Sequence, residues 1–157
     1  MMAIKIIRLL HLLTYMLVTS QVLFYLFILS DSLKVVSLGN FFELRKAVDS
    51  LMIGRFKFMY YSCLACSLLA VVIAARHPSS AFFISSVLAL IFLAVDLVVT
   101  VKGSLPLNSL SHSYQPGSES VEWEGVRIRW LNYMKYRGIA IVIGMIALLS
   151  GLVFGKN

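Results

Sequence analysis

Charged residues are scarce in this chain. Asp, Glu, Lys and Arg make up only 13% of its 157 residues, whereas soluble domains contain about a quarter. Hydrophobic residues make up 60%, and the mean hydropathy is +0.90. A soluble domain of this length keeps a large share of its surface in water, so it could not bury that much apolar area. The composition therefore excludes a purely water-soluble fold and predicts an integral membrane protein.

Cysteine is nearly absent, and the two that occur, Cys63 and Cys66, lie inside an apolar run. A C-x-x-C pair can be half of a zinc site or a redox pair, but no second pair accompanies it, and thiolates are unfavourable in lipid. We interpret both cysteines as small packing residues. The chain also lacks the patterns of a haem pair, a metal cluster, a nucleotide-binding loop or a nucleophile triad, so we expect no metal and no cofactor.

Four apolar stretches are long enough to cross a hydrocarbon core, which takes about 20 helical residues. We place these spans at residues 9–30, 58–75, 81–101 and 138–154. The first is too long, and too rich in Tyr, Gln and Phe, for a secretory signal, and no small-residue cleavage site follows it. The sequence thus predicts an all-α fold, a four-transmembrane-helix bundle that forms a single integral membrane domain over residues 1–157.

Two of the connecting segments carry helical patterns of their own. Residues 41–56 place apolar and charged side chains at helical spacing, which predicts an amphipathic interfacial helix in the first loop. It could rest on the lipid headgroups or form a lid over a pocket. A second pattern begins near Glu119 and runs without proline into the fourth span. It predicts a long last helix of about 50 Å that projects from the membrane.

Acidic residues are half as common as basic ones, 7 against 14, which gives a net charge of +7. In a membrane protein this excess predicts orientation, and we expect no nucleic-acid partner. One side of the membrane carries Lys5, Arg8, Arg76 and Lys156. The two long loops, on the other side, carry Lys34, Arg45, Lys46, Arg55, Lys57, Lys102, Arg127, Arg129, Lys135 and Arg137. The positive-inside rule places these loops in the cytoplasm and the termini outside. The membrane is expected to be a bacterial cytoplasmic membrane.

Polar side chains inside a span need a partner or a purpose, because a charge there costs about 2.5 to 3.5 kcal/mol. Asp96 is the clearest case. On a helix it shares a stripe with Ser85, Ala89, Thr100 and Gly103, whose small side chains allow another helix to approach, so Asp96 should face protein. The first span has a polar face of its own, made of His11, Thr14, Tyr15, Val18, Gln21 and Tyr25. It could hydrogen-bond to other helices or line a substrate or proton path.

The last helix carries Trp123, Trp130 and Arg137 at seven-residue spacing, which aligns them on one side. Aromatic belts account for tryptophan near an interface without any function. Arg137, however, enters the membrane on the side where Asp96 lies, and a buried charge needs a counter-charge. We therefore predict an Asp96–Arg137 ion pair. Gln21 and Tyr25 end the first span in the same leaflet, which predicts a polar pocket open to one side.

The run Thr100-Val-Lys-Gly-Ser-Leu-Pro-Leu-Asn108, followed by Trp130 and then Arg137, resembles the anthrone-oxygenase-like family of small four-helix membrane proteins. Most members are of unknown function, and a few fungal ones are assigned to the oxidation of anthrones to anthraquinones without an evident metal or flavin. The resemblance covers about a third of the chain and carries over Thr100, Pro106, Asn108, Trp130 and Arg137. The chain departs from the pattern at Met134, where many members place Asn or His.

Two classes of function remain open. The protein could bind or oxidise a lipophilic aromatic or quinone-like molecule, with Asn108 or Arg137 holding an oxyanion and Trp130 stacking on a ring. Alternatively, it could be a non-catalytic accessory subunit of a larger membrane complex, with other subunits or further copies of itself as partners. A transporter is a weaker possibility, since four helices leave little room for a path. The candidate pocket or ion-pair residues are Asp96, Arg137, Asn108, Trp130, Thr100, Gln21 and Tyr25.

Overall fold

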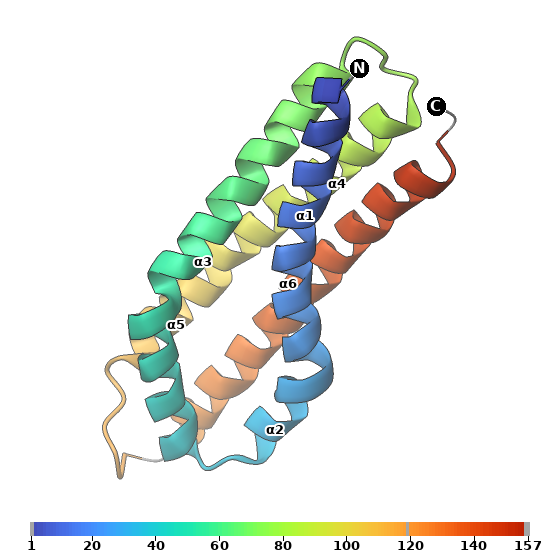
Figure 1. The fold of residues 1–157 in the computed structure, drawn as a ribbon. Coiled ribbons are helices and arrows are strands. Elements are labelled where there is room, and N and C mark those ends of the chain that lie inside the picture. The colour runs from blue at the N-terminus through green and yellow to red at the C-terminus, as the bar shows by residue number, and fades with distance from the viewer. Residues whose placement is uncertain (1, 119, 156–157) are drawn as a thin grey trace.

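A computed structural model describes residues 2–118 and 120–155 of the chain. Within these residues the regular structure is helical throughout. Four helical segments are long and apolar enough to cross a membrane, and they pack side by side as a bundle (Figure 1). They cover residues Ile4–Val35, Leu38–Ala74, Ala81–Ser111 and Val121–Val153. The predicted all-α four-helix bundle is therefore confirmed.

Two of the four segments contain a π-helical turn. The first segment consists of α1 (Met2–Phe24), the π-helix η1 (Tyr25–Leu29) and α2 (Ser30–Val35). The third consists of α4 (Ala81–Val99), the π-helix η2 (Thr100–Ser104) and α5 (Leu105–Ser111). The second and fourth segments are the uninterrupted helices α3 (Leu38–Ala74) and α6 (Val121–Val153).

The third segment continues beyond the predicted end of its span near residue 101. Pro106 has no backbone N–H, so it cannot donate to the preceding turn of an α-helix. The π-turn resolves this conflict, because the N–H of Leu105 reaches back to the carbonyl of Thr100 and Pro106 falls in the first turn of α5, where a missing N–H is tolerated. The segment after residue 101 is thus a helix rather than a loop up to Ser111.

The amphipathic segment 41–56 is helical, and it forms the first part of α3 rather than a separate element. Ser37 caps this helix by accepting a hydrogen bond from the N–H of Asn40, 3.3 Å away. From the amphipathic part to the end of the predicted span, residues 41–75, the chain has no proline, and Gly54 is the one glycine that weakens the helix. The helix consequently runs from the first loop directly into the membrane.

The long last helix is also present. α6 contains 33 residues, which corresponds to about 50 Å. Its N-cap is Ser120, whose hydroxyl accepts from the N–H of Trp123. The predicted start at Glu119 lies outside the described residues.

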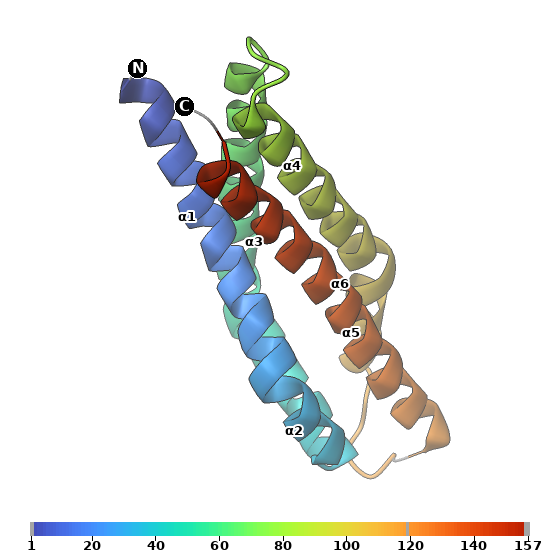
Figure 2. The same cartoon turned by 90° about the vertical axis from the view of Figure 1, so that its right-hand side faces the viewer.

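The two ends of the bundle differ in kind. Both ends of the described chain lie at the same end of the bundle as the short α3–α4 connection, and α2, α5 and the long connection before α6 lie at the opposite end (Figures 1 and 2). This arrangement agrees with the predicted grouping of the basic residues, of which Lys156 lies outside the described residues. Below, these are called the terminal end and the long-loop end.

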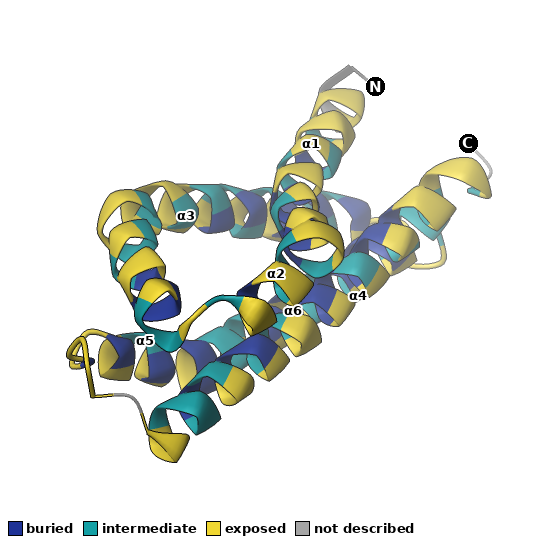
Figure 3. Cartoon of the chain, turned by 90° about the horizontal axis from the view of Figure 1, so that it is seen from below, coloured by how far each residue is buried: buried dark blue, intermediate teal, exposed yellow. Residues whose placement is uncertain are grey.

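The interior is divided between two clusters of buried side chains. One lies within the predicted spans and contains Tyr15, Val18, Cys63, Leu93 and Ile141, among others. The other lies at the long-loop end and is rich in aromatic residues: Tyr25, Phe41, Phe42, Tyr114 and Trp130. Seen along the bundle, the buried faces of the helices turn toward one another and the exposed faces turn outward (Figure 3). The cysteines are free thiols, and Cys63 packs in the first cluster.

Candidate functional site

Asp96 and Arg137 form an ion pair inside the bundle. Asp96, on α4, is fully buried, and its Oδ1 accepts a hydrogen bond from Arg137 Nε on α6 at 2.8 Å. Arg137 Nη2 donates to the hydroxyl of Tyr60 on α3 at 3.1 Å. The predicted pair is therefore confirmed, and it ties three helices together. A charge-assisted bond of this length is stronger than a neutral one, especially away from water.

Met134 completes the surroundings of Arg137. Its sulfur lies one helical turn before Arg137 and accepts from Nη1 at 3.4 Å. The thioether is a weak acceptor and cannot donate or take up a proton as a base would. The residue at this position therefore supports the ion pair and brings no acid or base to it.

A second polar cluster forms around Asn108, in α5. Its Oδ1 accepts two hydrogen bonds, from Arg45 Nη2 at 2.9 Å and from Trp130 Nε1 at 2.8 Å. Arg45 Nη2 also donates to Asp49 Oδ1 at 2.7 Å, within α3. Asn108 thus connects α3, α5 and α6 through a single oxygen atom.

Trp130 lies at the centre of the aromatic cluster. The guanidinium of Arg45 sits over its ring, 4.3 Å from the centroid, which is a cation–π geometry. Tyr25 and Phe41 meet the same ring edge-to-face, with centroid distances of 5.8 and 5.7 Å. Among the described residues the Tyr25 hydroxyl has no hydrogen-bond partner, although it is buried. Trp130, Asn108 and Tyr25, three of the predicted site residues, are therefore brought together.

A groove of about 260 Å³ opens beside Asn108. We call it the Asn108 groove, and it is lined by Asp49, Ser50, Ile53, Leu105, Asn108, Ser109 and His112. His112 Nε2 lies 3.6 Å from Asp49 Oδ2, and the His112 side chain is half exposed. Ile53 and Leu105 give the groove two apolar side chains, and the other lining residues are polar or charged.

The amide of Asn108 has a defined orientation. Arg45 and Trp130 can only donate, so the atom that faces them must be the amide oxygen. The NH₂ group consequently points away from them, and it donates to no described residue. Asn108 lines the groove, so a ligand bound there would lie near an amide whose NH₂ group has no partner among the described residues.

The remaining predicted site residues do not join these clusters by hydrogen bonds. The Thr100 hydroxyl donates to the backbone carbonyl of Asp96 at 2.8 Å, so its hydrogen bond stays within the same helical segment. Gln21 Oε1 is buried and accepts no hydrogen bond within the described ranges. The pocket predicted around Asp96 also differs from the groove, because Asn108 lines the groove while Asp96 and Arg137 do not. Asn108 follows Asp96 along the third segment toward the long-loop end, so the groove lies nearer that end than the ion pair does.

Sequence reasoning did not assign three residues of these clusters to the site: Arg45, Asp49 and His112. For Arg45 a signal exists, because it follows Phe41 by four positions and so shares the apolar face of the amphipathic helix. An arginine on that face needs a buried partner. Another signal lies in the backbone, since π-turns are frequent at functional sites. η1 contributes Tyr25, and η2 leads into the helix that carries Asn108.

The described residues contain no group of three or more His, Cys, Asp or Glu side chains that could hold a metal ion. Comparison of the chain with protein-family models, with curated proteins and with solved structures found no match.

Proposed function

We propose that the protein binds an amphipathic aromatic or quinone-like molecule in the Asn108 groove. The observation that carries this proposal is the orientation of the Asn108 amide, whose NH₂ group is free beside the groove. A carbonyl or phenolic oxygen of the ligand would accept from it. Ile53 and Leu105 would contact the ring. A groove of about 260 Å³ lies just below the usual range of ligand pockets, so a compound of one or two rings fits best.

The position of the groove supports a ligand that arrives from the membrane. Asn108 follows the predicted end of the third span by about two helical turns. The neighbouring helix α3 continues from this level into the predicted second span. The groove therefore lies near the level of the lipid headgroups. Amphipathic ring compounds concentrate at that level, because their apolar ring contacts lipid while their polar group contacts water. Tyrosine and tryptophan side chains are enriched there for the same reason.

The binding test uses Trp130 as a fluorescence reporter. In a Trp123→Phe background Trp130 is the remaining tryptophan, and it is hydrogen-bonded to Asn108. The purified protein is titrated in detergent with menadione, a two-ring quinone. We expect saturable quenching. Asn108→Asp keeps an acceptor for Arg45 and Trp130 but removes the NH₂ donor, so menadione should bind at least about tenfold more weakly.

Asn132→Asp provides the matched control. It makes the same chemical change on the exposed face of α6, outside the groove. This variant should bind menadione as the parent does, and both variants should keep the parent helix content. Equal affinity in the two variants would show that the groove is not the binding site.

The family resemblance extends the proposal to oxidation of an anthrone-like ligand. In its favour, Asn108 and Trp130, two positions of the resemblance, form one hydrogen-bonded unit at the groove. Aerobic incubation with an anthrone, with the heat-unfolded protein as the blank, measures formation of the anthraquinone. Turnover that disappears in Asn108→Asp and persists in Asn132→Asp would support an oxygenase. Binding without turnover would restrict the function to binding.

A second candidate function is that of an accessory subunit in a larger membrane complex. Its specific support is a set of apolar side chains that are exposed beyond the predicted spans at the long-loop end. Examples are Val35 (85% exposed), Leu51 (72%) and Val121 (91%). Light scattering of the protein purified in mild detergent from its own membranes tests this alternative. A stoichiometric partner together with absent menadione binding would favour the subunit.

A further inference from the structure

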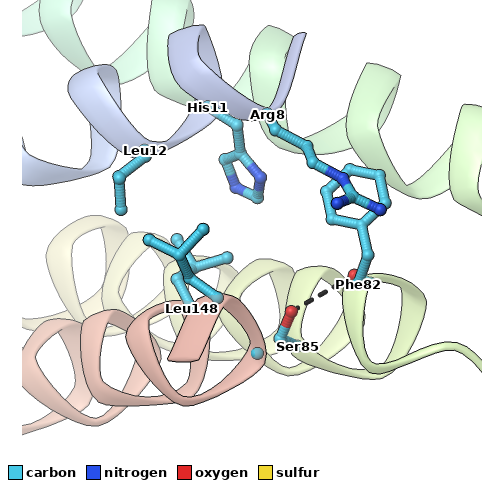
Figure 4. A pocket seen from close by; sticks show the side chains of 8 residues that line it. Arg8, His11, Leu12, Phe82, Ser85 and Leu148 are labelled. Carbon is cyan, nitrogen blue, oxygen red and sulfur yellow. Dashed lines mark hydrogen bonds between the residues drawn. The ribbon is translucent and has the colours of Figure 1, made fainter. Parts of the chain in front are cut away.

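The terminal end of the bundle contains a separate cavity, which we call the terminal cavity. It measures about 50 Å³ and lies between α1, α4 and α6. Its polar lining comes from Arg8, His11 and Ser85, and the rest from Phe82, Gly151 and leucines of α1 and α6. Figure 4 shows the Arg8 and His11 side chains extending from α1 toward the other two helices. Gly151 lets α6 approach α4 closely beside the cavity, because a Cβ there would overlap the Ser85 side chain.

Arg8 forms no ion pair with a carboxylate of the described residues. Its guanidinium lies 4.2 Å from the centroid of the Phe82 ring, which positions an otherwise flexible cation. The residues that line the cavity come from three parts of the chain, residues 1–30, 50–95 and 125–157. None of the seven acidic residues lies in these parts. Lys5 and Arg76 add further positive charge to this end. An anion from outside the chain is therefore the natural partner of Arg8.

His11 provides an acceptor in the same cavity. The side chain is buried, with 1% of the residue exposed, and Nε2 lies 3.0 Å from Ser67 Oγ. The Ser67 hydroxyl donates to the carbonyl of Cys63, 2.7 Å away, so we assign His11 Nε2 as the donor in the contact with Ser67. The neutral imidazole then carries its acceptor on Nδ1. That atom has no hydrogen-bond partner among the described residues.

The location restricts the source of the anion. Arg8 directly precedes the first predicted span, so it lies at the depth of lipid phosphates. Leu152 lines the cavity and is exposed, so it would contact acyl chains. The cavity of about 50 Å³ is too small to enclose a whole lipid headgroup, but Arg8 is exposed at its mouth. We propose that this mouth binds the headgroup of an anionic phospholipid of the phosphatidylglycerol type. Its phosphate would accept from Arg8, and a glycerol hydroxyl would donate to His11 Nδ1. This site is independent of the Asn108 groove.

The test measures thermal unfolding of the purified protein in detergent, with added dioleoylphosphatidylglycerol, dioleoylphosphatidylcholine or inorganic phosphate. A ligand that binds only the folded state raises the unfolding temperature in proportion to its affinity. We expect phosphatidylglycerol to stabilise more than phosphatidylcholine, which has the same phosphate but no hydroxyl donor and no net charge. Inorganic phosphate at the same concentration should have no effect.

The variants Arg8→Gln and Lys5→Gln assign the effect to the cavity. Both remove one exposed cation from the same helix, but only Arg8 lines the cavity. Arg8→Gln should weaken phosphatidylglycerol binding by about tenfold or more and lower its stabilisation to that of phosphatidylcholine. Lys5→Gln should leave the preference intact. Equal losses in both variants, equal stabilisation by the two lipids, or stabilisation by free phosphate would each overturn the proposal.

Discussion

At the scale of single residues, Arg137 keeps its charge in the bundle by meeting three acceptors. They are the carboxylate of Asp96, the hydroxyl of Tyr60 and the sulfur of Met134, at 2.8, 3.1 and 3.4 Å. With only 11% of its side chain exposed, Arg137 depends on these partners in place of water. Such a pair often contributes little net stability over apolar packing, yet the loss of either partner leaves the other charge buried alone.

This asymmetry gives the first prediction. Asp96→Asn or Arg137→Gln alone should lower the free energy of unfolding by about 3 to 5 kcal/mol, because each leaves one uncompensated charge. The double variant should lose much less than the sum, since no charge remains. SDS titration in mixed micelles, followed by circular dichroism, measures all three. Additive losses would contradict a direct interaction between the two side chains.

At the scale of helices, close contacts depend on a few glycines. Gly144 on α6 lies against Tyr15, whose hydroxyl crosses the core to the carbonyl of Ala89 on α4 at 3.1 Å. A Cβ at this position would overlap that hydroxyl. The contact lets α1, α4 and α6 meet in the cluster within the predicted spans. It is the close approach that small residues permit between membrane helices.

The second prediction follows from this contact. Gly144→Ala should destabilise the protein by about 1 to 3 kcal/mol through overpacking. The loss should shrink in a Tyr15→Phe background, because the nearest overlapping atom is then missing. Unfolding in mixed micelles again provides the measurement.

Gly125 serves as the control, since it also lies in α6 but has open space where a Cβ would be added, with no surrounding side chain or other helix within 4 Å. Gly125→Ala should raise stability by about 0.5 to 1 kcal/mol through helix propensity. If both alanine variants were stabilised equally, the proposed crowding at Tyr15 would be wrong.

At the scale of the whole molecule, the bundle has a membrane half and an aromatic half. Between Arg137 and the end of α6 at Val153 the helix has 17 residues, about 25 Å, which approaches the thickness of a hydrocarbon core. The remaining 16 residues of α6, from Val121 to Tyr136, lead to the aromatic cluster at the long-loop end. We therefore expect the long-loop half, which holds the Asn108 groove, to extend beyond the hydrocarbon core on one side.

Chemical labelling tests this orientation. Cysteines introduced as His77→Cys and Ser118→Cys occupy exposed positions at opposite ends. The natural Cys63 and Cys66 lie within a predicted span and should stay unlabelled by a membrane-impermeant maleimide. By the positive-inside rule, His77→Cys should react in intact cells and Ser118→Cys only in inside-out vesicles. Reaction of both from one face would exclude the four-span arrangement, and the reverse pattern would exclude the predicted orientation alone.

The sequence by itself determined the four spans, the long last helix and the Asp96–Arg137 pair. Each depends on local properties: hydropathy over about 20 residues, helical periodicity, and the depth of a charge within its span. Asp96 and Arg137 could be matched because both are costly in lipid and enter the same leaflet. With few charges in the spans, little choice of partner remained.

Only the tertiary structure decided how the Asn108 cluster is assembled. Arg45 and Asn108 are 63 positions apart, and helical periodicity shows the face of a residue but not its neighbour on another helix. The π-turn before Pro106 extends the third segment to Asn108, and packing of the aromatic cluster brings Arg45 and Trp130 to the same oxygen. Outside the hydrocarbon core, water can hydrogen-bond to the side chains of Arg45, Asn108 and Trp130 when they are not paired. The cost of leaving them unpaired is therefore small, and it does not predict which residues pair.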